Sequence, residues 1–279
     1  MTREFLLGAV AYDAKVVPIW EGFKVFFEAN GLPFDFVLYS NYERQVEAHL
    51  AGEIDVAWNS PLALIEADRA AKKRLRTASA IAMRDTDCDL TSVVVVRADS
   101  AFKTAADLAG KKLGVGAADS PQATLIPLSS LAELGIEGTV VRHDVLNGKH
   151  GDHIGGERDA VKALLAGTVD AACIIDGNRL AFAREGLIGT AGPTAVRVVH
   201  QTAPYDHCNF TVLDNPHPAT ATFVELLLGM SYDDPALRPL LDLEGLKKWL
   251  PGRVSGYVAL EQAVDRYRYL DRWLSRVAA

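Results

Sequence analysis

Cysteine is scarce in this chain, and long apolar runs and an excess of positive charge are both lacking. The 279 residues include three cysteines, an odd number that cannot form a complete disulfide framework. No apolar run approaches the roughly 20 residues needed to span a bilayer, so no membrane insertion is expected. The formal net charge of −7 argues against nucleic acid as a partner. The apolar fraction of 49%, with 23% charged residues, is ordinary for a globular protein with a sizeable core.

The N-terminal residues contain no pattern of a secretory signal. Thr2-Arg3-Glu4 leads directly into an apolar stretch that reads as a first core strand, without an h-region or a cleavage site. A cytoplasmic location is therefore expected. A periplasmic location is the alternative, because a processed chain given a new start methionine would look similar.

The most informative pattern that is present is a repeated helix–turn–strand phrase. Val46–Trp58 reads VEAHLAGEIDVAW, and Val161–Ile174 reads VKALLAGTVDAACI. A strand that breaks into a polar loop precedes each copy, at Leu7–Asp13 and at Leu113–Asp119. Each half therefore predicts strand–loop–helix–strand–helix–strand, which indicates a repeat of whole lobes rather than of short solenoid units.

A glycine and an aspartate recur at matching places in the two phrases. Gly52 and Gly167 suit the left-handed position that ends a helix, and an apolar strand follows each of them. Asp55 and Asp170 stand at the starts of these strands. We expect both aspartates to accept hydrogen bonds from the backbone rather than to contact a ligand.

Two β segments bracket the second half of the chain, at Thr91–Arg97 and Asn209–Leu213. They predict that the chain crosses from lobe one to lobe two and returns. Lobe one would then comprise residues 1–92 and 208–279, and lobe two residues 93–207. The predicted fold is α/β, with two lobes, an interlobe cleft and a two-strand hinge that permits closure around a ligand.

Four further segments have definite expectations. Asn59-Ser60-Pro61 predicts the start of a helix, with Ser60 as its N-cap and Pro61 at the first helical position. Thr104–Ala109, followed by Gly110, predicts a short helix. Leu146–Gly156 (LNGKHGDHIGG) breaks every periodic pattern and is interpreted as an insertion, which is where function often lies. The chain from Ala219 to its end predicts helices punctuated by glycine and proline.

Four phrases carry a resemblance to a known family: QVEAHLAGEIDVAWNSP, VVVVRADSAFKTAADLAGKKLGVG, DAVKALLAGTVDAAC and GYVALEQAVDR. The chain resembles the type II periplasmic solute-binding proteins, and among them the phosphonate/phosphate-binding branch of ABC importers. The resemblance implies a non-catalytic protein that binds a small polar solute in its cleft. It leaves the partner transporter unspecified.

Such proteins bind their ligand at helix N-termini, where free N–H groups and the positive end of the dipole favour anions. The expected ligand-binding residues lie in the loops before these helices and beside the second crossing strand: Tyr12, Asp13, Asn59, Ser60, Ser120, Gln122, Thr124, Asp176, Asn178 and His207.

The sequence departs from the family pattern at two of these places. The family's Ser-Thr-Ser-Gly type of run is replaced around Ser120, where Asp119 adds negative charge and Pro121 lacks an N–H donor. Glu157-Arg158-Asp159 stands in place of a Ser-His-Asp run. Together with Asp13 and Asp176, these changes favour an amine-bearing or zwitterionic solute over a bare phosphonate or carboxylate.

An enzyme on the same scaffold is the alternative function, because fold does not fix function. His153 or Glu157 could act as a general acid or base, and Cys88 as a nucleophile, in a decarboxylase, lyase or hydrolase that acts on a small carboxylate or amine. The neighbours His207 and Cys208 are a weaker pair, because adjacent residues of a strand point to opposite faces. Cys173 is interpreted as a core residue.

The histidines of the insertion raise the question of a metal. His143, His150, Asp152 and His153 lie near Glu157, and imidazole and carboxylate are common metal ligands. Their spacing matches no fixed metal motif, and a polar glycine-rich loop accounts for them equally well. We therefore predict neither a metal nor a cofactor.

Overall fold

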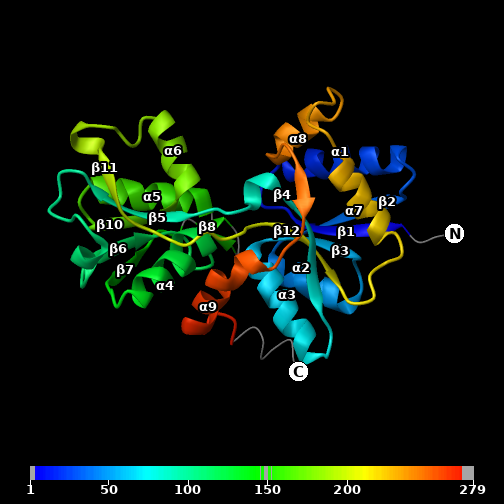
Figure 1. Cartoon of the computed structure of the whole chain (residues 1–279), viewed down its shortest axis with the longest axis horizontal. Coiled ribbons are helices and arrows are strands. Elements are labelled where there is room, and N and C mark those ends of the chain that lie inside the picture. The colour runs from blue at the N-terminus through cyan, green and yellow to red at the C-terminus, as the bar shows by residue number, and fades with distance from the viewer. Residues whose placement is uncertain (1–3, 145, 148–149, 152, 272–279) are drawn as a thin grey trace. The chain divides into compact units, whose positions relative to one another are not determined.

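The computed structural model describes residues 4–144, 146–147, 150–151 and 153–271. The chain divides into two compact units. Unit 1 comprises Met1–Cys88, Asp206–Val258 and Tyr269–Ala279, and unit 2 comprises Asp89–Tyr205 and Ala259–Arg268. Each unit has its own β-sheet with helices on both faces (Figure 1), which is the three-layer arrangement of α/β proteins.

The elements of unit 1 follow the predicted alternation of strands and helices. They are β1 (Phe5–Val10), α1 (Val16–Ala29), β2 (Phe34–Tyr39), α2 (Tyr42–Ala51), β3 (Val56–Asn59), α3 (Pro61–Lys73), β4 (Ala78–Arg84), the 3₁₀ turn η1 (Asp85–Asp87), β12 (Asn209–Leu213), α7 (Thr220–Gly229), α8 (Arg238–Glu244), β13 (Trp249–Pro251) and η5 (Ser255–Tyr257). The strand order is β13-β4-β12-β3-β1-β2, in which β1, β2 and β3 are parallel.

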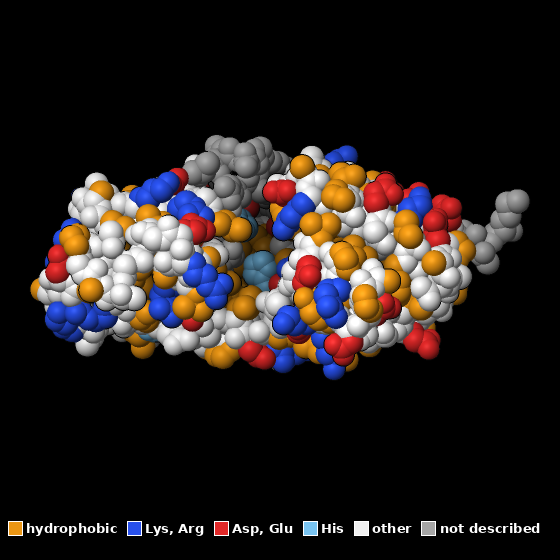
Figure 2. Space-filling model, turned by 90° about the horizontal axis from the view of Figure 1, so that it is seen from above, with side chains coloured by type: hydrophobic (Ala, Val, Ile, Leu, Met, Phe, Trp, Pro, Cys, Tyr) orange, Lys and Arg blue, Asp and Glu red, His pale blue; other side chains and the backbone are white. Residues whose placement is uncertain are grey.

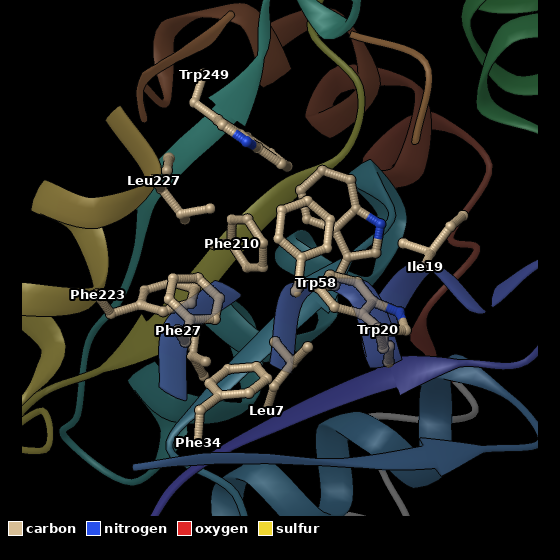
Figure 3. Packing of buried hydrophobic residues seen from close by; sticks show 14 of the residues in the cluster. Leu7, Ile19, Trp20, Phe27, Phe34, Trp58, Phe210, Phe223, Leu227 and Trp249 are labelled. Atoms are coloured by element: carbon tan, nitrogen blue, oxygen red, sulfur yellow. The ribbon is translucent and has the colours of Figure 1, made fainter. Parts of the chain in front are cut away.

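The core of unit 1 is aromatic on one face of the sheet. Helices α1, α7 and α8 cover this face, and α2 and α3 cover the other (Figure 1). Trp20 of α1 packs together with Trp58, Phe210 and Trp249 (Figure 3). Such side chains each bury about 150–250 Å², so this cluster fixes the ends of β3 and β12 relative to α1.

Unit 2 is built in the same way. Its elements are β5 (Ser92–Arg97), η2 (Ala105–Leu108), β6 (Lys112–Val115), η3 (Pro121–Leu125), α4 (Ile126–Glu133), β7 (Thr139–Arg142), β8 (Leu146–Asn147), β9 (His150–Gly151), α5 (His153–Leu165), β10 (Ala171–Ile175), α6 (Asp176–Arg184), η4 (Gly192–Thr194) and β11 (Val196–Gln201). Helix α9 (Val258–Arg266) lies almost wholly in this unit, where Arg266 donates to Ser129 of α4.

Strand β5 is buried on both of its faces. Val93 and Val95 pack against α5 and α6, whereas Val94 and Val96 pack on the side of α4. A continuous run of valines is typical of a strand covered on both sides, so the predicted strand at residues 91–97 is confirmed within one residue.

The two sheets have corresponding strand orders, as the repeated phrase predicts. Within the described residues, the order β2-β1-β3-β12-β4 of unit 1 corresponds to β7-β6-β10-β5-β11 of unit 2. In each set the first three strands are parallel and the fourth is antiparallel to its neighbours. The predicted repeat of lobes is thus present as a repeat of topology.

The recurring residues play the predicted structural roles. Asp55 accepts from the N–H of Leu6 at 2.9 Å, and Asp170 accepts from the N–H of Lys112 at 2.8 Å. Gly52 and Gly167 have φ values of 76° and 74°, in the left-handed region that favours glycine.

The structure corrects three expectations about elements. The predicted helix at 104–109 is only the 3₁₀ turn η2, with Asp107 accepting from Thr104 in a capping box. The predicted insertion ends sooner than Gly156, because α5 already begins at His153. The C-terminal region is not wholly helical, since Trp249–Pro251 forms β13. Burial of Trp249 in the aromatic core favours the strand there.

Two surface properties complete the description. No helix within the described ranges is long and apolar enough to cross a membrane. Acidic and basic side chains are interspersed over the face of unit 1 drawn in Figure 2, rather than gathered into a patch of one sign.

Candidate functional site

Unit 2 contains a buried carboxyl group at the start of α5. Glu157 is fully buried, and its Oε2 accepts from the N–H of Ile175 at 2.9 Å and from Nδ2 of Asn178 at 3.0 Å. Its Oε1 has no hydrogen-bond partner among the residues that the structure describes. Burial raises the pKa of Glu157 to about 7, although Ile175, Asn178 and Gln122 lower it. The structure therefore brings together three predicted site residues, Gln122, Glu157 and Asn178.

Further predicted residues of unit 2 lie in the π-helical turn η3 before α4 and at its N-cap, Ser120. Ser120 and Thr124 are buried. Ser120 Oγ accepts from the N–H of Ala123 at 3.1 Å, and Thr124 Oγ1 donates to the carbonyl of Ala117 at 2.8 Å. Both hydroxyls are thus engaged in shaping this segment. Gln122 is also buried, and its Oε1 has no partner in the described part of the chain.

Ser92, which the sequence did not indicate as a site residue, supports this segment together with Tyr205. Ser92 Oγ donates to the carbonyl of Gln122 at 2.5 Å and lies 2.7 Å from Tyr205 Oη. Burial raises the pKa of Tyr205, so it remains a neutral phenol. Ser92 and Tyr205 lie 113 positions apart, and no local pattern signals their contact.

The remaining predicted polar groups of unit 2 are already paired. Asp176 accepts from Arg179 Nε at 2.6 Å. Asp119 lies 3.2 Å from His153 Nε2, and Arg158 pairs with Glu185 across α5 and α6. Arg158 and Arg179 thus each have a carboxylate partner. Glu157 differs from these residues, because its buried Oε1 can still accept a hydrogen bond.

In unit 1, Asn59 belongs to an internal hydrogen-bond network. Its Nδ2 donates to Thr211 Oγ1 at 2.9 Å, and its Oδ1 accepts from Gln45 Nε2 at 2.8 Å. Thr211 continues the network to Asn209, which donates to Tyr257 Oη at 3.0 Å. This network links β3, β12 and α2.

The other predicted residues of unit 1 lie at its surface or in a cap. Tyr12 and Asp13 are exposed, and Asp13 accepts from the N–H of Lys15 at 2.8 Å. Ser60 caps α3 by accepting from the N–H of Ala63 at 3.2 Å, and Pro61 occupies the first helical position. The predicted Ser-Pro cap is confirmed.

Unit 1 also holds a buried ion cluster that the sequence analysis missed. Arg84 contacts Asp87 through Nε at 2.5 Å and Nη2 at 3.1 Å, and Glu244 through Nη1 at 3.2 Å. Its guanidinium lies 5.2 Å from the ring centre of Trp58. Burial raises the pKa of Glu244 to about 7. The sequence does place Arg84 between an apolar strand and acidic residues, which is a local signal for its pairing with Asp87. It contains no signal for the contact with Glu244, which lies 160 positions away.

The side chains of His207 and Cys208 meet, contrary to the expectation from strand alternation. His207 Nδ1 lies 3.1 Å from Cys208 Sγ. The reason is that β12 begins only at Asn209, so these two residues are not constrained to opposite faces. Cys88 is half-buried and donates to the carbonyl of Arg84 at 3.4 Å. Cys173 is fully buried in the core, as predicted.

The histidines near the insertion do not form a metal-ligating group in the described part of the chain. His143 Nδ1 lies 3.2 Å from the carbonyl of Val115, and His153 faces Asp119. Asp152 and the side chain of His150 lie outside the described residues.

Comparison with known proteins identifies the class of protein to which the chain belongs. Residues 20–257 match the family described as "ABC transporter, phosphonate, periplasmic substrate-binding protein", which is more than half of the chain.

Solved structures of low sequence identity share the fold. PhnD1 from Prochlorococcus marinus, in complex with methylphosphonate, has 15% identity and a TM-score of 0.67, over 95% of this chain and 98% of that one. XAC2383 from Xanthomonas citri, bound to chloride, has 18% identity and a TM-score of 0.69, over 96% and 99%. The aliphatic sulphonate-binding protein SsuA from Escherichia coli has 17% identity and a TM-score of 0.57, over 98% and 89%.

The fold is therefore that of the two-lobed type II periplasmic binding proteins, as the resemblance implied. The chain belongs to the family of periplasmic substrate-binding proteins of phosphonate ABC transporters. It is a binding protein for a small solute, and the enzyme alternative is not favoured. The expected cytoplasmic location is not supported, because the family is described as periplasmic.

Proposed function

We propose that the protein binds a small solute that carries an ammonium group, and that Glu157 of unit 2 accepts the hydrogen bond from this group. The observation that carries the proposal is the buried oxygen Oε1 of Glu157, which has no partner in the described part of the chain. A buried acceptor without a partner costs about 1–3 kcal/mol. A ligand that donates to it recovers this energy.

The surroundings of Glu157 favour a cation over an anion. Arg158 and Arg179, at the starts of α5 and α6, are paired with Glu185 and Asp176. A carboxylate whose neighbouring cations are already paired attracts an ammonium and repels a phosphonate.

The loop at Ser120 is a poor cradle for an oxyanion, which supports the same proposal. Pro121 has no N–H, and the N–H of Ala123 is taken by Ser120 Oγ. The helix start therefore offers fewer donors than an open N-terminus provides. In this proposal Gln122 Oε1 accepts a second hydrogen bond from the solute, and Asn178 orients Glu157.

The family's description supports two further parts of the proposal. The protein acts in the periplasm, and it delivers its solute to an ABC importer that the sequence does not specify. Recovery of the protein from the periplasmic fraction of its native cells would support the first part. Its exclusive presence in the cytoplasm would contradict it.

The test compares matched solutes that differ only in the amine, by isothermal titration calorimetry. Suitable pairs are 2-aminoethylphosphonate with ethylphosphonate and 4-aminobutyrate with butyrate. We expect the aminated member of at least one pair to bind more tightly by roughly 10–100-fold, because a hydrogen bond to a charged group contributes about 1.5–3 kcal/mol. In Glu157→Gln the preference for that amine should largely disappear.

Asp159→Asn is the matched control, because it removes a partly exposed carboxylate of the same helix, α5, that is paired with Lys162 rather than with a cation beside Glu157. It should retain the preference for the amine. Equal or tighter binding of the deaminated members by the unmodified protein would overturn the proposal.

A further inference from the structure

Three side chains of unit 1 form a cluster that the proposed solute site does not use. Asp87, His207 and Cys208 bring a carboxylate oxygen, an imidazole nitrogen and a thiol sulfur within 4.8 Å of one another. His207 Nδ1 lies 3.1 Å from Cys208 Sγ and 3.6 Å from Asp87 Oδ1. Asp87 is 2% exposed and Cys208 9%, so these two donors are shielded from bulk water, whereas the His207 side chain is partly exposed.

Backbone hydrogen bonds hold these residues together. The N–H of His207 donates to the carbonyl of Asp87 at 2.8 Å, which places the end of η1 beside the segment that enters β12. Tyr257 Oη donates to the carbonyl of His207 at 2.9 Å. The cluster is thus fixed by contacts that do not use its own donor atoms.

Asp87 is oriented by a neighbour in the way that metal-binding carboxylates are. Arg84 donates through Nε to Oδ2 and through Nη2 to Oδ1. Each carboxylate oxygen has two lone pairs, so Oδ1 keeps one position for a further partner. Arg84 is itself held by the carbonyl of Glu244 at 2.7 Å.

The two separations from His207 Nδ1, to Cys208 Sγ and to Asp87 Oδ1, are close to those of a tetrahedral zinc site. With bonds of about 2.0–2.3 Å to nitrogen, oxygen and sulfur, tetrahedral ligand atoms lie roughly 3.3–3.6 Å apart. The observed 3.1 and 3.6 Å require little movement. Hard cations such as Mg²⁺ and Ca²⁺ require oxygen ligands, whereas a set of sulfur, nitrogen and oxygen suits zinc.

We propose that Asp87 Oδ1, His207 Nδ1 and Cys208 Sγ bind one Zn²⁺ ion in unit 1, with the fourth position open. The thiol proton passes to solvent as the metal binds. Three protein ligands with an open position is the arrangement in which a zinc ion also takes a water or a further ligand. This zinc site shares no residue with the proposed solute site of unit 2, so the proposal does not depend on which solute the protein binds.

The experiment uses the full chain without a histidine tag, stripped of metal under reducing conditions. We expect one equivalent of Zn²⁺ to bind in a competition titration against a chromophoric chelator. Co²⁺ in place of zinc should give a thiolate-to-cobalt charge-transfer band and the intense visible bands of a tetrahedral site. Cys208→Ser should abolish the charge-transfer band. His207→Ala should weaken zinc binding by more than the roughly 10–100-fold that follows loss of an outer contact.

Controls come from the other thiols and histidines of the chain. The double variant Cys88→Ser/Cys173→Ala leaves Cys208 as the sole thiol of the sequence and should keep both the band and the stoichiometry. This variant assigns the thiolate even if Cys208→Ser fails to fold. His153→Ala should bind zinc as the unmodified protein does.

Three results would overturn the proposal: no equivalent of zinc bound, binding unchanged in both Cys208→Ser and His207→Ala, or binding lost in His153→Ala. The zinc titration contains no solute, so its failure leaves the solute proposal standing. Failure of the calorimetric comparison likewise leaves the zinc site standing.

Discussion

The titration of Glu157 makes the free energy of unfolding and the affinity for the solute depend on pH in opposite directions. Its carboxyl group has a pKa raised by burial from 4.5 to about 7, so folding favours its protonated form. Between these two values the folded protein binds more protons at this group than the unfolded chain. The contribution of Glu157 to the free energy of unfolding therefore falls as the pH rises through this range.

Replacing Glu157 by glutamine should remove this contribution. From pH 5 to pH 8 the unmodified protein should lose up to about 3 kcal/mol more of its free energy of unfolding than Glu157→Gln, since one pKa unit corresponds to about 1.36 kcal/mol. Urea unfolding at a series of pH values measures both proteins. Glu244 also has a pKa of about 7 but is common to the two, so it cancels in the difference. Parallel pH profiles would show that Glu157 is not buried as described.

The same residue predicts how solute binding depends on pH. An ammonium solute requires the ionised carboxylate, so its affinity should rise as the pH increases from 6 to 8, by up to about tenfold per unit below the pKa of the carboxyl. Calorimetry with the aminated solute measures this rise. An affinity that stays constant over this range, or falls, would contradict the assignment of Glu157.

At the scale of single residues, the sequence predicted local roles and missed distant ones. The Ser60 cap and the core position of Cys173 follow from neighbours along the chain, and both were predicted. The contact of Arg84 with Glu244 depends on α8 returning to β4, and that of Ser92 with Tyr205 on two strands far apart in sequence. No local pattern encodes such pairs. The assignment of ligand-binding residues stays a prediction.

At the scale of elements, the repeat is the feature that sequence predicted best. The phrase that ends on Leu-Ala-Gly produces the same left-handed turn in both units, followed by an aspartate that accepts a hydrogen bond from the neighbouring strand. The segment 104–109 was predicted to be a helix and is a 3₁₀ turn. Its capping box stabilises the first turn, but the segment is too short to add further helical turns. The boundaries predicted for the two lobes remain predictions.

The two aspartates should stabilise their own units to a similar degree. Asp55→Ala and Asp170→Ala each remove the acceptor of a backbone N–H, and each should lower the free energy of unfolding by about 1–2 kcal/mol. Trp20, Trp58 and Trp249 lie in unit 1, so tryptophan fluorescence should report the Asp55 variant directly. Far-UV circular dichroism reports both.

Asp68→Ala is the control for these variants, because among the described residues the carboxylate of Asp68 pairs with Lys72 one turn along α3. It should change the free energy of unfolding by no more than about 0.5 kcal/mol. Losses as small as this for Asp55→Ala and Asp170→Ala would show that the shared hydrogen bond does not stabilise the repeat.

At the scale of the whole molecule, membership of the family establishes what the protein does, and the chemistry of unit 2 indicates what it binds. A net charge of −7, three cysteines and no long apolar run were consistent with many globular proteins. Among these classes of globular protein, the paired lobes favoured a ligand-binding protein. The expected cytoplasmic location rested on the N-terminal residues alone, and the family's description does not support it.

Recovery of the bound solute tests the central claim most directly. The protein is incubated with the aminated solutes, its thermal unfolding is followed, and the solute is released and analysed by mass spectrometry. We predict a higher unfolding temperature with one solute, since ligation of the native state stabilises it, and recovery of one equivalent of that solute chemically unchanged. Consumption of the solute over many turnovers, with loss of activity in His153→Ala or Glu157→Ala, would contradict the account.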